Sequence, residues 1–256
     1  MSGRNWDAAS YDRVGGPMTQ MASAVVDRLS LSGSETVMDA GCGTGQVTRM
    51  LAELLPNGHV IAVDADTEMV RTAKANLADL IASRRVTLAQ GDLTEFTVDE
   101  PVDAILSTAT FHWISDHQRL FDNLISLLKP GGRLVAQCGG QGNIAELRDL
   151  SAELAHDPRF TEWLKDWTPP WTYNGPEETK QRLERAGFDE VRTWLQDWPV
   201  TPDDPAGYLS TITLGAQFQR MPAEVGAEFV QTVIEMASSP LTVGYVRLNI
   251  DAKRPG

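Results

Sequence analysis

The sequence predicts a single α/β domain built on a doubly wound parallel sheet, and three observations support this fold class. Between residues 35 and 137, short runs rich in β-branched residues alternate with longer segments whose apolar residues recur at helical spacing. The predicted strands are apolar without strict alternation, as expected for strands that are buried on both faces. The chain of 256 residues is long enough for one such domain with insertions.

The first half of the chain contains the regular alternation of elements. The predicted strands cover 36–40, 59–64, 85–90, 102–107 and 132–138, and the predicted helices cover 46–55, 67–83 and 117–128. Lys129-Pro130-Gly131-Gly132 marks the end of the last of these helices. Proline cannot continue a helix, and glycine accepts the backbone angles of the turn that follows.

After residue 139 the pattern changes to helices joined by segments rich in tryptophan and proline. Helices are predicted over 144–155, 177–186, 203–218 and 223–237, and strands over 191–195 and 245–252. The alternation in the last strand predicts that it is half exposed. We interpret 139–176 and 198–244 as cap insertions. The second of them lies between the last two strands and is expected to act as a lid.

The charge and cysteine content exclude several classes of partner. Asp and Glu (35) outnumber Lys and Arg (22), and the net charge of −13 argues against nucleic acid and anionic membranes as partners. Two cysteines, Cys42 and Cys138, cannot form a disulfide framework. The amino end has no signal-peptide pattern, and no apolar run has the length of a membrane span. The sequence thus predicts a soluble cytoplasmic protein, either a monomer or a homodimer.

The strongest local signal for function is the segment Asp39-Ala40-Gly41-Cys42-Gly43-Thr44-Gly45. It follows the first predicted strand and precedes the first predicted helix. Gly41 and Gly43 allow a sharp turn and a close approach of the backbone to a ligand. The helix that begins near Gln46 presents free N–H groups and a positive dipole end, which suit an anionic ligand group.

Glycine loops at this position also occur in proteins that bind dinucleotides or nucleoside triphosphates. A dinucleotide fingerprint requires Gly or Ala three positions after the second glycine, but that position is Gln46. No Gly-Lys-Ser or Gly-Lys-Thr follows, so the sequence lacks a Walker loop. A dinucleotide-dependent oxidoreductase is therefore a rival interpretation, and Gln46 is the residue that argues against it.

Two acidic residues complete a possible nucleoside site. Asp64 ends the second predicted strand, and a carboxylate there can accept hydrogen bonds from both hydroxyls of a ribose. Asp92 follows the third strand in Gly91-Asp92-Leu93, where its carboxylate can receive the exocyclic amine of adenine. Asp92 can also be a helix cap, and Asp64 a solvated loop residue. The set suits a nucleoside that carries an amino acid and a sulfonium.

These motifs resemble the class I S-adenosylmethionine-dependent methyltransferases. The resemblance rests on D-A-G-C-G-T-G, V-D, G-D-L and L-K-P-G-G, and it spans roughly residues 20–140. The segment from Phe111 to His117 (F-H-W-I-S-D-H) and the closing V-R-L-N-I-D-A-K-R-P are similar to elements of the trans-aconitate methyltransferase and juvenile hormone acid methyltransferase-like group. The resemblance implies a Rossmann-like, seven-stranded, mostly parallel sheet whose last strand is antiparallel.

The resemblance also implies S-adenosylmethionine as the cofactor and no metal. The residues expected to contact the cofactor follow the first four strands or lie near the amino end: Tyr11, Asp39, Gly41, Gly43, Gly45, Asp64, Ala65, Met69, Asp92, Leu93, Thr108 and Ala109. In the family, the glycine loop holds the methionine part, the acids bind ribose and adenine, and backbone after the fourth strand faces the sulfonium. Residues 1–30, with Tyr11, are expected to form helices over the cofactor.

The residues predicted to bind the acceptor are His112, Trp113, Trp171 and Arg220. His112 is the candidate catalytic residue, as general base for a hydroxyl acceptor, and His117 is the second candidate. A carboxylate acceptor needs no base at neutral pH, because its pKa is about 4. Two competing interpretations stay open: a buried His112 held by backbone groups, and tryptophans that form only the core of the cap.

Few basic residues are available for an acceptor with several negative charges. Arg220 is the only one between residues 194 and 245, and Arg13, Arg159 and Lys165 are further candidates. A tricarboxylate needs several Arg or Lys groups. The sequence therefore favours O-methylation of an apolar or aromatic small molecule with one carboxylate or hydroxyl. The alternatives are C- or N-methylation of a natural product or quinone-type intermediate, a protein or tRNA acceptor, and a non-catalytic adenosyl-binding protein.

Overall fold

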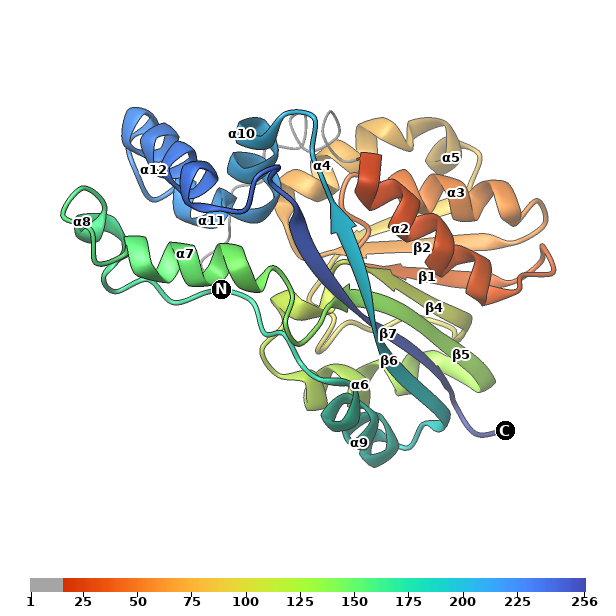
Figure 1. Ribbon diagram of the computed structural model, residues 1–256. Helices are drawn as coiled ribbons and strands as arrows, with labels where there is room; N and C mark the ends of the chain where they lie inside the picture. Colours follow the sequence, from red (N-terminus) through yellow and green to blue (C-terminus); the bar gives the residue numbers. More distant parts are fainter. Residues whose placement is uncertain (1–15) are drawn as a thin grey trace. The chain divides into compact units, whose positions relative to one another are not determined.

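The computed structural model describes residues 16–256, and these fall into two compact units. The first unit contains residues 18–141, 171–196 and 247–256, and it holds most of the sheet. Among the described residues, the second unit contains 16–17, 142–170 and 197–246, and it is mainly helical (Figure 1). The second unit thus gathers most of the two segments interpreted as cap insertions, whereas Trp171 and the residues after it belong to the first.

The first unit is organised around a seven-stranded sheet with the order β3-β2-β1-β4-β5-β7-β6. The strands are β1 (Thr36–Ala40), β2 (His59–Asp64), β3 (Val86–Gln90), β4 (Val102–Thr108), β5 (Leu128–Gly139), β6 (Asp189–Val200) and β7 (Val243–Lys253). The pairings among β1 to β5 are parallel, and β7 runs antiparallel to β5. The Rossmann-like arrangement implied by the sequence is confirmed.

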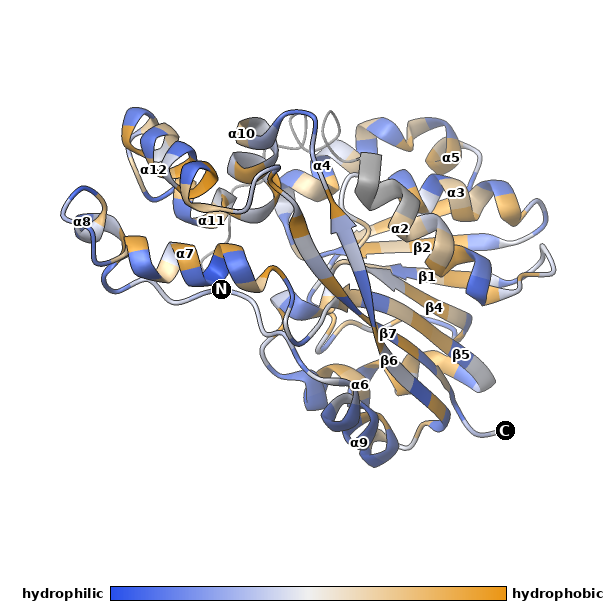
Figure 2. Ribbon diagram, in the orientation of Figure 1, coloured by the Kyte–Doolittle hydropathy of each residue, from blue (hydrophilic) through white to orange (hydrophobic). Residues whose placement is uncertain are grey.

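Helices of the first unit cover both faces of this sheet. They are α2 (Gly16–Val26), η1 (Asp27–Leu29), α3 (Gln46–Leu54), α4 (Thr67–Asn76), α5 (Ala78–Ala82), η2 (Phe111–Trp113), α6 (His117–Leu127) and α9 (Pro176–Ala186). One apolar cluster joins α3 and α4 to one face through Leu51 and Ala73, and another joins α6 and α9 to the opposite face through Phe121 and Leu183. Figure 2 shows apolar residues along the central strands and a hydrophilic α9.

The helix predicted over 67–83 is divided in two. Asp66 begins α4, because its carboxylate accepts hydrogen bonds from the backbone N–H groups of Glu68 and Met69. At Leu77 the backbone leaves helical geometry, with φ −107° and ψ 14°. Leu77 is fully buried and lies against Gly45 of the glycine loop. Packing against the loop therefore accompanies a break that the apolar periodicity did not indicate.

The prediction that the last strand is half exposed is wrong. β7 lies between β5 and β6, so neighbours flank it on both sides. Asn249 is completely buried, and its Oδ1 accepts hydrogen bonds from Arg28 at 2.6 Å and from Gln137 at 2.9 Å. Arg247, on the same side of the strand, is only 4% exposed. The polar residues of β7 face a buried network and not water.

The second unit contains α7 (Ala145–Leu154), α8 (Thr161–Leu164), α10 (Pro205–Tyr208), η3 (Leu209–Thr213), α11 (Gly215–Phe218) and α12 (Ala223–Met236). The helix predicted over 203–218 is three short segments, because the N–H of Leu214 bonds to the carbonyl of Leu209 and forms one wide turn. Phe160 and Phe229 pack edge to face at 5.4 Å. The lid function of this unit stays a prediction.

No helix between residues 16 and 256 combines the length and the apolar character that crossing a bilayer requires.

Candidate active site

The glycine loop connects the carboxyl end of β1 to α3. Gly41, Gly43 and Gly45 have φ angles of 88°, 55° and 88°, which glycine adopts without strain. The N–H groups of Gly41 and Cys42 donate to the carbonyl of Val63 at 2.8 and 3.0 Å, so the loop is tied to β2. A Cβ on Gly41 would lie 2.1 Å from Thr110 Oγ1, whereas one on Gly43 would meet nothing within 4 Å. There is therefore no room for a side chain at Gly41, whereas the space beside Gly43 is open.

Asp39 lies behind this loop, completely buried in β1. Its Oδ2 accepts a hydrogen bond from the Thr48 hydroxyl at 2.6 Å, and its buried Oδ1 has no hydrogen-bond partner among the described residues. Burial raises the pKa of Asp39 to about 7, and the charge of Asp64 acts in the same direction. Leaving a buried carboxylate oxygen without a donor is costly. A cationic ligand group beside Asp39 would reduce this cost.

Asp64 ends β2 and faces the same loop. Its Oδ2 accepts the N–H of Gly43 and its Oδ1 accepts the N–H of Asp66, each at 2.9 Å. Burial raises the pKa of Asp64, although these two hydrogen bonds oppose the rise. Each oxygen keeps a second lone pair, so the hydroxyls of a ribose can still donate to it. Asp64 thus lies at the predicted place and also holds the loop in position.

The remaining residues predicted to bind adenosine follow β2 and β3. Asp92 Oδ1 accepts hydrogen bonds from the backbone N–H and the hydroxyl of Thr94 at 2.9 and 2.8 Å, so it caps its own turn. No helix follows Asp92, so the alternative that it caps a helix is wrong. Leu93 belongs to the apolar core, which leaves its backbone for a ligand, and Met69 is also buried. Ala65 is exposed.

After β4 the backbone turns sharply at Ala109, whose φ is 55°. Such a conformation costs a residue with a side chain about 1–3 kcal/mol and is common at functional sites. The N–H of Ala109 donates to the carbonyl of Gln137 at 2.7 Å. The Thr110 hydroxyl donates to the carbonyl of Thr108 at 3.0 Å and lies 3.3 Å from the carbonyl of Gly41. Thr110 therefore links the glycine loop to the segment that carries His112 and Trp113.

His112, Trp113, Trp171 and Tyr173 form an aromatic cluster in the first unit. The ring of His112 lies 5.0 Å from that of Trp113 and 5.8 Å from that of Tyr173. Trp171 lies 5.9 Å from Trp113 and stacks on Tyr173 at 6.0 Å. The N–H of Thr172 donates to the carbonyl of His112 at 2.7 Å and fixes the two segments together. The structure thus assembles three of the four predicted acceptor residues and adds Tyr173, which the sequence did not indicate.

His112 is 8% exposed. Burial, together with the positive charge of Arg247, holds its pKa well below the usual value. The backbone N–H of Gly139 donates to His112 Nδ1 at 3.3 Å. His117 is also buried, and its Nε2 and Nδ1 bond to the Phe111 carbonyl at 2.9 Å and the Asn174 amide at 2.7 Å. Protein groups therefore occupy both ring nitrogens of His117.

The structure does not bring every predicted site residue into these contacts. Arg220 belongs to the second unit, where its Nε donates to the carbonyl of Trp163 at 3.1 Å. Tyr11 lies outside the described residues, so its expected place over the cofactor stays a prediction. Arg247, a buried basic residue paired with Gly139, was missed. The alternation of the last strand contained the signal, but the interpretation as half exposed placed its polar side in water.

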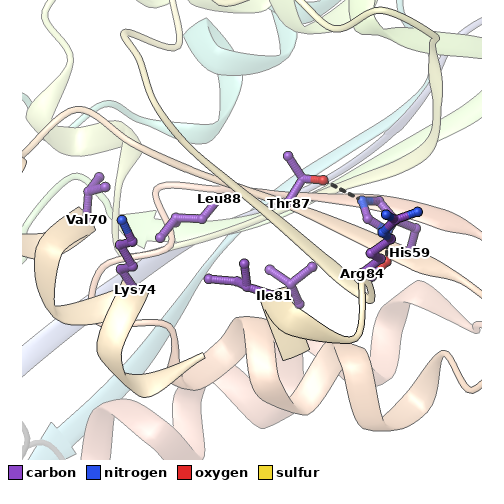
Figure 3. Close-up of a pocket in the computed structure, with 8 residues that line it drawn as sticks. His59, Val70, Lys74, Ile81, Arg84, Thr87 and Leu88 are labelled. Carbon is purple, nitrogen blue, oxygen red and sulfur yellow. Dashed lines mark hydrogen bonds between the residues drawn. The ribbon is translucent and has the colours of Figure 1, made fainter. Parts of the chain in front are cut away.

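A separate pocket of about 580 Å³ lies between α4, α5 and the strands β2 and β3. Figure 3 shows His59, bonded to Thr87, at one end and Lys74 from α4 at the other. His59 is the first residue of β2, and Thr87 is the second of β3. The pocket therefore extends toward the amino ends of these strands, whereas the glycine loop lies at the carboxyl end of β1. None of the predicted site residues lines it.

The site offers carboxylates and backbone groups to a ligand. Within residues 16–256 there is no group of three or more His, Cys, Asp or Glu arranged to hold a metal. S-adenosylmethionine carries an ammonium and a sulfonium, and the buried Oδ1 of Asp39 provides an acceptor for a cationic group. The open space beside Gly43 and the carboxylate of Asp64 suit the remaining parts of S-adenosylmethionine, including its ribose. The residues present therefore fit this cofactor, and fold and site together define a Rossmann-like methyltransferase.

Comparison with known proteins agrees with this class. Residues 37–132 match a family described as a methyltransferase domain. The chain is 35% identical over 132 residues to trans-aconitate 2-methyltransferase of Azoarcus sp. This match covers 52% of this chain and 50% of the relative. It is 28% identical over 185 residues to malonyl-[acyl-carrier protein] O-methyltransferase of Priestia megaterium. This match covers 71% of this chain and 65% of the relative. The chain thus spans about half to two thirds of the length of these relatives.

Solved structures share the fold at low sequence identity. Phosphoethanolamine N-methyltransferase 2 of Haemonchus contortus superposes with a TM-score of 0.65 at 17% identity, over 97% of this chain and 57% of that one. YcgJ of Bacillus subtilis superposes with a TM-score of 0.63 at 16% identity, over 94% of this chain and 99% of that one. Residues 37–132 match this methyltransferase-domain family, and the chain is similar to the group that includes trans-aconitate methyltransferase. The predicted class and cofactor are confirmed.

Proposed function

We propose that this protein transfers a methyl group from S-adenosylmethionine to an oxygen of a small molecule that has an apolar or aromatic body and a carboxylate or hydroxyl. One observation carries the proposal, the contact of Thr110 with Gly41. It sets the loop expected to hold the cofactor beside the segment with His112 and Trp113. A methyl donor and an aromatic acceptor pocket need this proximity, because methyl transfer requires the reacting atoms in line and in contact.

The residues of the chain position the reactants and exclude water. When bound, S-adenosylmethionine supplies an electrophilic methyl group, which forms a bond to the acceptor as the carbon–sulfur bond breaks and leaves its electron pair on sulfur. Asp39 and Asp64 would hold the amino acid and ribose parts, and the turn at Ala109 would shape the space at the methyl group. Orientation of this kind supplies roughly 7–11 kcal/mol of the barrier reduction.

The named relatives act on trans-aconitate and on malonyl-[acyl-carrier protein], and both of these acceptors contain carboxylates. The aromatic cluster supports an acceptor with an apolar or aromatic body, because its rings provide a large apolar contact area. The net charge of −13 favours a small molecule over tRNA. The cytoplasmic location, the oligomeric state and the lid over the acceptor remain predictions.

A two-stage experiment tests the proposal. Calorimetry first compares S-adenosylhomocysteine, S-adenosylmethionine and NADH as ligands of the full chain. A screen with isotope-labelled methyl donor then covers aliphatic acids, aromatic acids, phenols and malonyl carried on an acyl carrier protein. We expect binding of both adenosyl compounds and labelled ester or ether from at least one small acceptor. Binding of NADH without binding of either adenosyl compound would overturn the proposal.

A further inference from the structure

The pocket between α4, α5 and the strands β2 and β3 differs in chemistry from the glycine loop. Its volume of about 580 Å³ lies in the range of roughly 300–1,000 Å³ that small-molecule sites occupy. Apolar, basic and hydroxyl side chains line it: Val70, Ile81, Val86, Leu88, His59, Lys74, Arg84 and Thr87. Among residues 16–256, no Asp or Glu lines it. The charged side chains of this pocket are therefore all basic, within a protein of net charge −13.

The two cationic side chains of the pocket lie at opposite ends. Figure 3 shows Lys74 of α4 at one end and Arg84 beside His59 at the other. Arg84 follows α5 in a turn with a φ angle of 59°. Its carbonyl accepts a hydrogen bond from His59 Nδ1 at 3.2 Å, and its N–H donates to the carbonyl of Ile81 at 3.0 Å. These bonds hold the backbone that carries Arg84 at the edge of the pocket.

The nearest carboxylates of α4 and α5 are engaged elsewhere. Glu68 and Asp79 form ion pairs with other arginines at 2.8 and 2.7 Å. In the described part of the chain, neither Lys74 nor Arg84 belongs to an ion pair. The pocket thus presents two cations without a protein counter-ion, which favours an anionic ligand.

An apolar surface separates these two cations. Ile81 from α5 and Leu88 from β3 are each half-buried, and Figure 3 shows both between the two ends of the pocket. Contact with such side chains favours an apolar ligand body, because it removes apolar surface from water. The pocket therefore matches a small molecule with an anionic group at each end of an apolar body.

We propose that this pocket is a second small-molecule site, in which Lys74 and Arg84 bind the two anionic groups of such a dianion. The site is separate from methyl transfer, because it extends toward the amino ends of β2 and β3, and no residue expected to contact cofactor or acceptor lines it. The inference therefore does not depend on the proposed function.

A matched ligand series tests the two ends of the pocket. Suberate, 8-hydroxyoctanoate and 1,8-octanediol share a chain of eight carbons and carry two, one and no carboxylates. Calorimetry measures their binding to the full chain at low ionic strength, where exposed charges are least screened. Loss of one exposed ion pair corresponds to about two- to fivefold in affinity, so we expect two successive decreases of this size. Equal affinities, or no binding of suberate, would overturn the inference.

Substitutions at the two ends show which residues recognise the charges. In Lys74→Met and in Arg84→Met only one cation remains, so suberate and 8-hydroxyoctanoate should bind equally, whereas Lys74→Arg should keep the preference for suberate. Both residues are exposed, so these changes should leave the protein folded. Arg71→Met is the matched control, because Arg71 also lies on α4 but pairs with Glu68 and does not line the pocket. An unchanged preference for suberate in both pocket variants would refute the site.

Chemical labelling locates the bound dianion. Acetic anhydride modifies lysine amines, and mass spectrometry compares Lys74 with Lys180 of α9, which lies outside the pocket. We expect saturating suberate to slow the acetylation of Lys74 and not that of Lys180. Equal protection of both lysines would contradict the site. So would mutually exclusive binding of suberate and S-adenosylhomocysteine, which would place suberate in the adenosyl site.

Discussion

Backbone turns and two carboxylates lie at the ends of β1 and β2, whereas aromatic rings and a buried imidazole follow β4, and a buried guanidinium comes from β7 beside the end of β5. The first region contains two carboxylates beside the glycine loop, Asp39 in β1 and Asp64 at the end of β2. The second contains the buried side chains of His112 and Arg247 and the rings of Trp113 and Tyr173. The difference teaches that neighbouring parts of one sheet edge can differ sharply in chemical character, with carboxylates beside one turn and aromatic rings beside the next.

The largest effect is expected at Gly41. Valine at this position would combine a φ of 88° with a Cβ 2.1 Å from Thr110 Oγ1. We expect the free energy of unfolding to fall by about 2–6 kcal/mol, from strain and overpacking together, with loss of cofactor binding. Urea denaturation and calorimetry with S-adenosylhomocysteine measure both effects.

Gly43→Ala is the matched control, because a Cβ at Gly43 would meet nothing within 4 Å. Its stability should fall by only about 1–2 kcal/mol, the cost of a left-handed residue. Cofactor affinity should still decrease if the open side of the loop receives the ligand. Equal destabilisation by the two substitutions would show that contact with Thr110 is not what limits Gly41.

The two regions should respond to pH with opposite sign. The folded-state pKa of Asp39, about 7, is above its unfolded value of 3.8, so its contribution to stability is lost as pH rises from about 4 to 7. Asp39→Asn should therefore become more stable relative to the wild type over this range, by up to about 1.4 kcal/mol per pH unit. Urea denaturation of both proteins without cofactor, at several pH values, measures this difference.

His112 has a folded-state pKa below its unfolded value of 6.5, so its contribution is present above pH 6.5 and is lost as pH falls. His112→Gln should therefore gain relative stability below pH 6.5. A difference between either variant and its wild type that does not change with pH would contradict the burial of that group.

A smaller effect is expected for Asp64→Ala. It removes the acceptor of the Gly43 and Asp66 N–H groups and the proposed ribose ligand. Loss of one such hydrogen bond costs about 1.5–3 kcal/mol, so cofactor affinity should fall about tenfold or more. Asp66→Ala removes the cap of α4 instead, and should cost about 0.5–2 kcal/mol of stability with little effect on cofactor affinity. Similar affinities in the two variants would argue against Asp64 as a ligand.

The smallest effect is expected at Tyr173, whose ring lies 5.8 Å from His112 and stacks on Trp171. Aromatic pairs contribute about 0.5–1.5 kcal/mol beyond their buried area. Tyr173→Leu should lower kcat/KM for an aromatic acid about two- to tenfold, and Tyr173→Phe should change it much less. Steady-state kinetics give these ratios. A similar change in cofactor affinity would indicate that Tyr173 contributes to cofactor binding and not to acceptor binding.

The cofactor side was largely predictable because its signals are local. The turn at Gly41 to Gly45 needs glycine at positive φ, and a short motif in the sequence records that need. Asp64 follows its strand directly, so the parallel sheet brings it to the loop. The position of Asp92 in the sequence did not show that it bonds to Thr94. A carboxylate at this position can bind a ligand or cap a turn, and both uses leave the same sequence signal.

The acceptor side was less predictable because it depends on distant partners. The hydrogen bond to His112 Nδ1 comes from Gly139, which lies 27 residues along the chain, and the burial of Arg247 depends on β7 lying inside the sheet. Alternation in one strand does not reveal whether its polar face meets water or another polar face. The break at Leu77 and the wide turn at Leu209–Thr213 likewise arise from packing and hydrogen bonds that periodicity does not encode.

The register of β7 against β5 runs from Arg133 with Lys253 to Gly139 with Arg247, and it involves no residue of the helical excursions at 142–170 and 201–242. Insertions, deletions or exchange of these excursions would leave that ladder intact. A lineage could therefore lengthen, shorten or replace either excursion while it inherits this sheet, and the glycine loop that follows β1, unchanged.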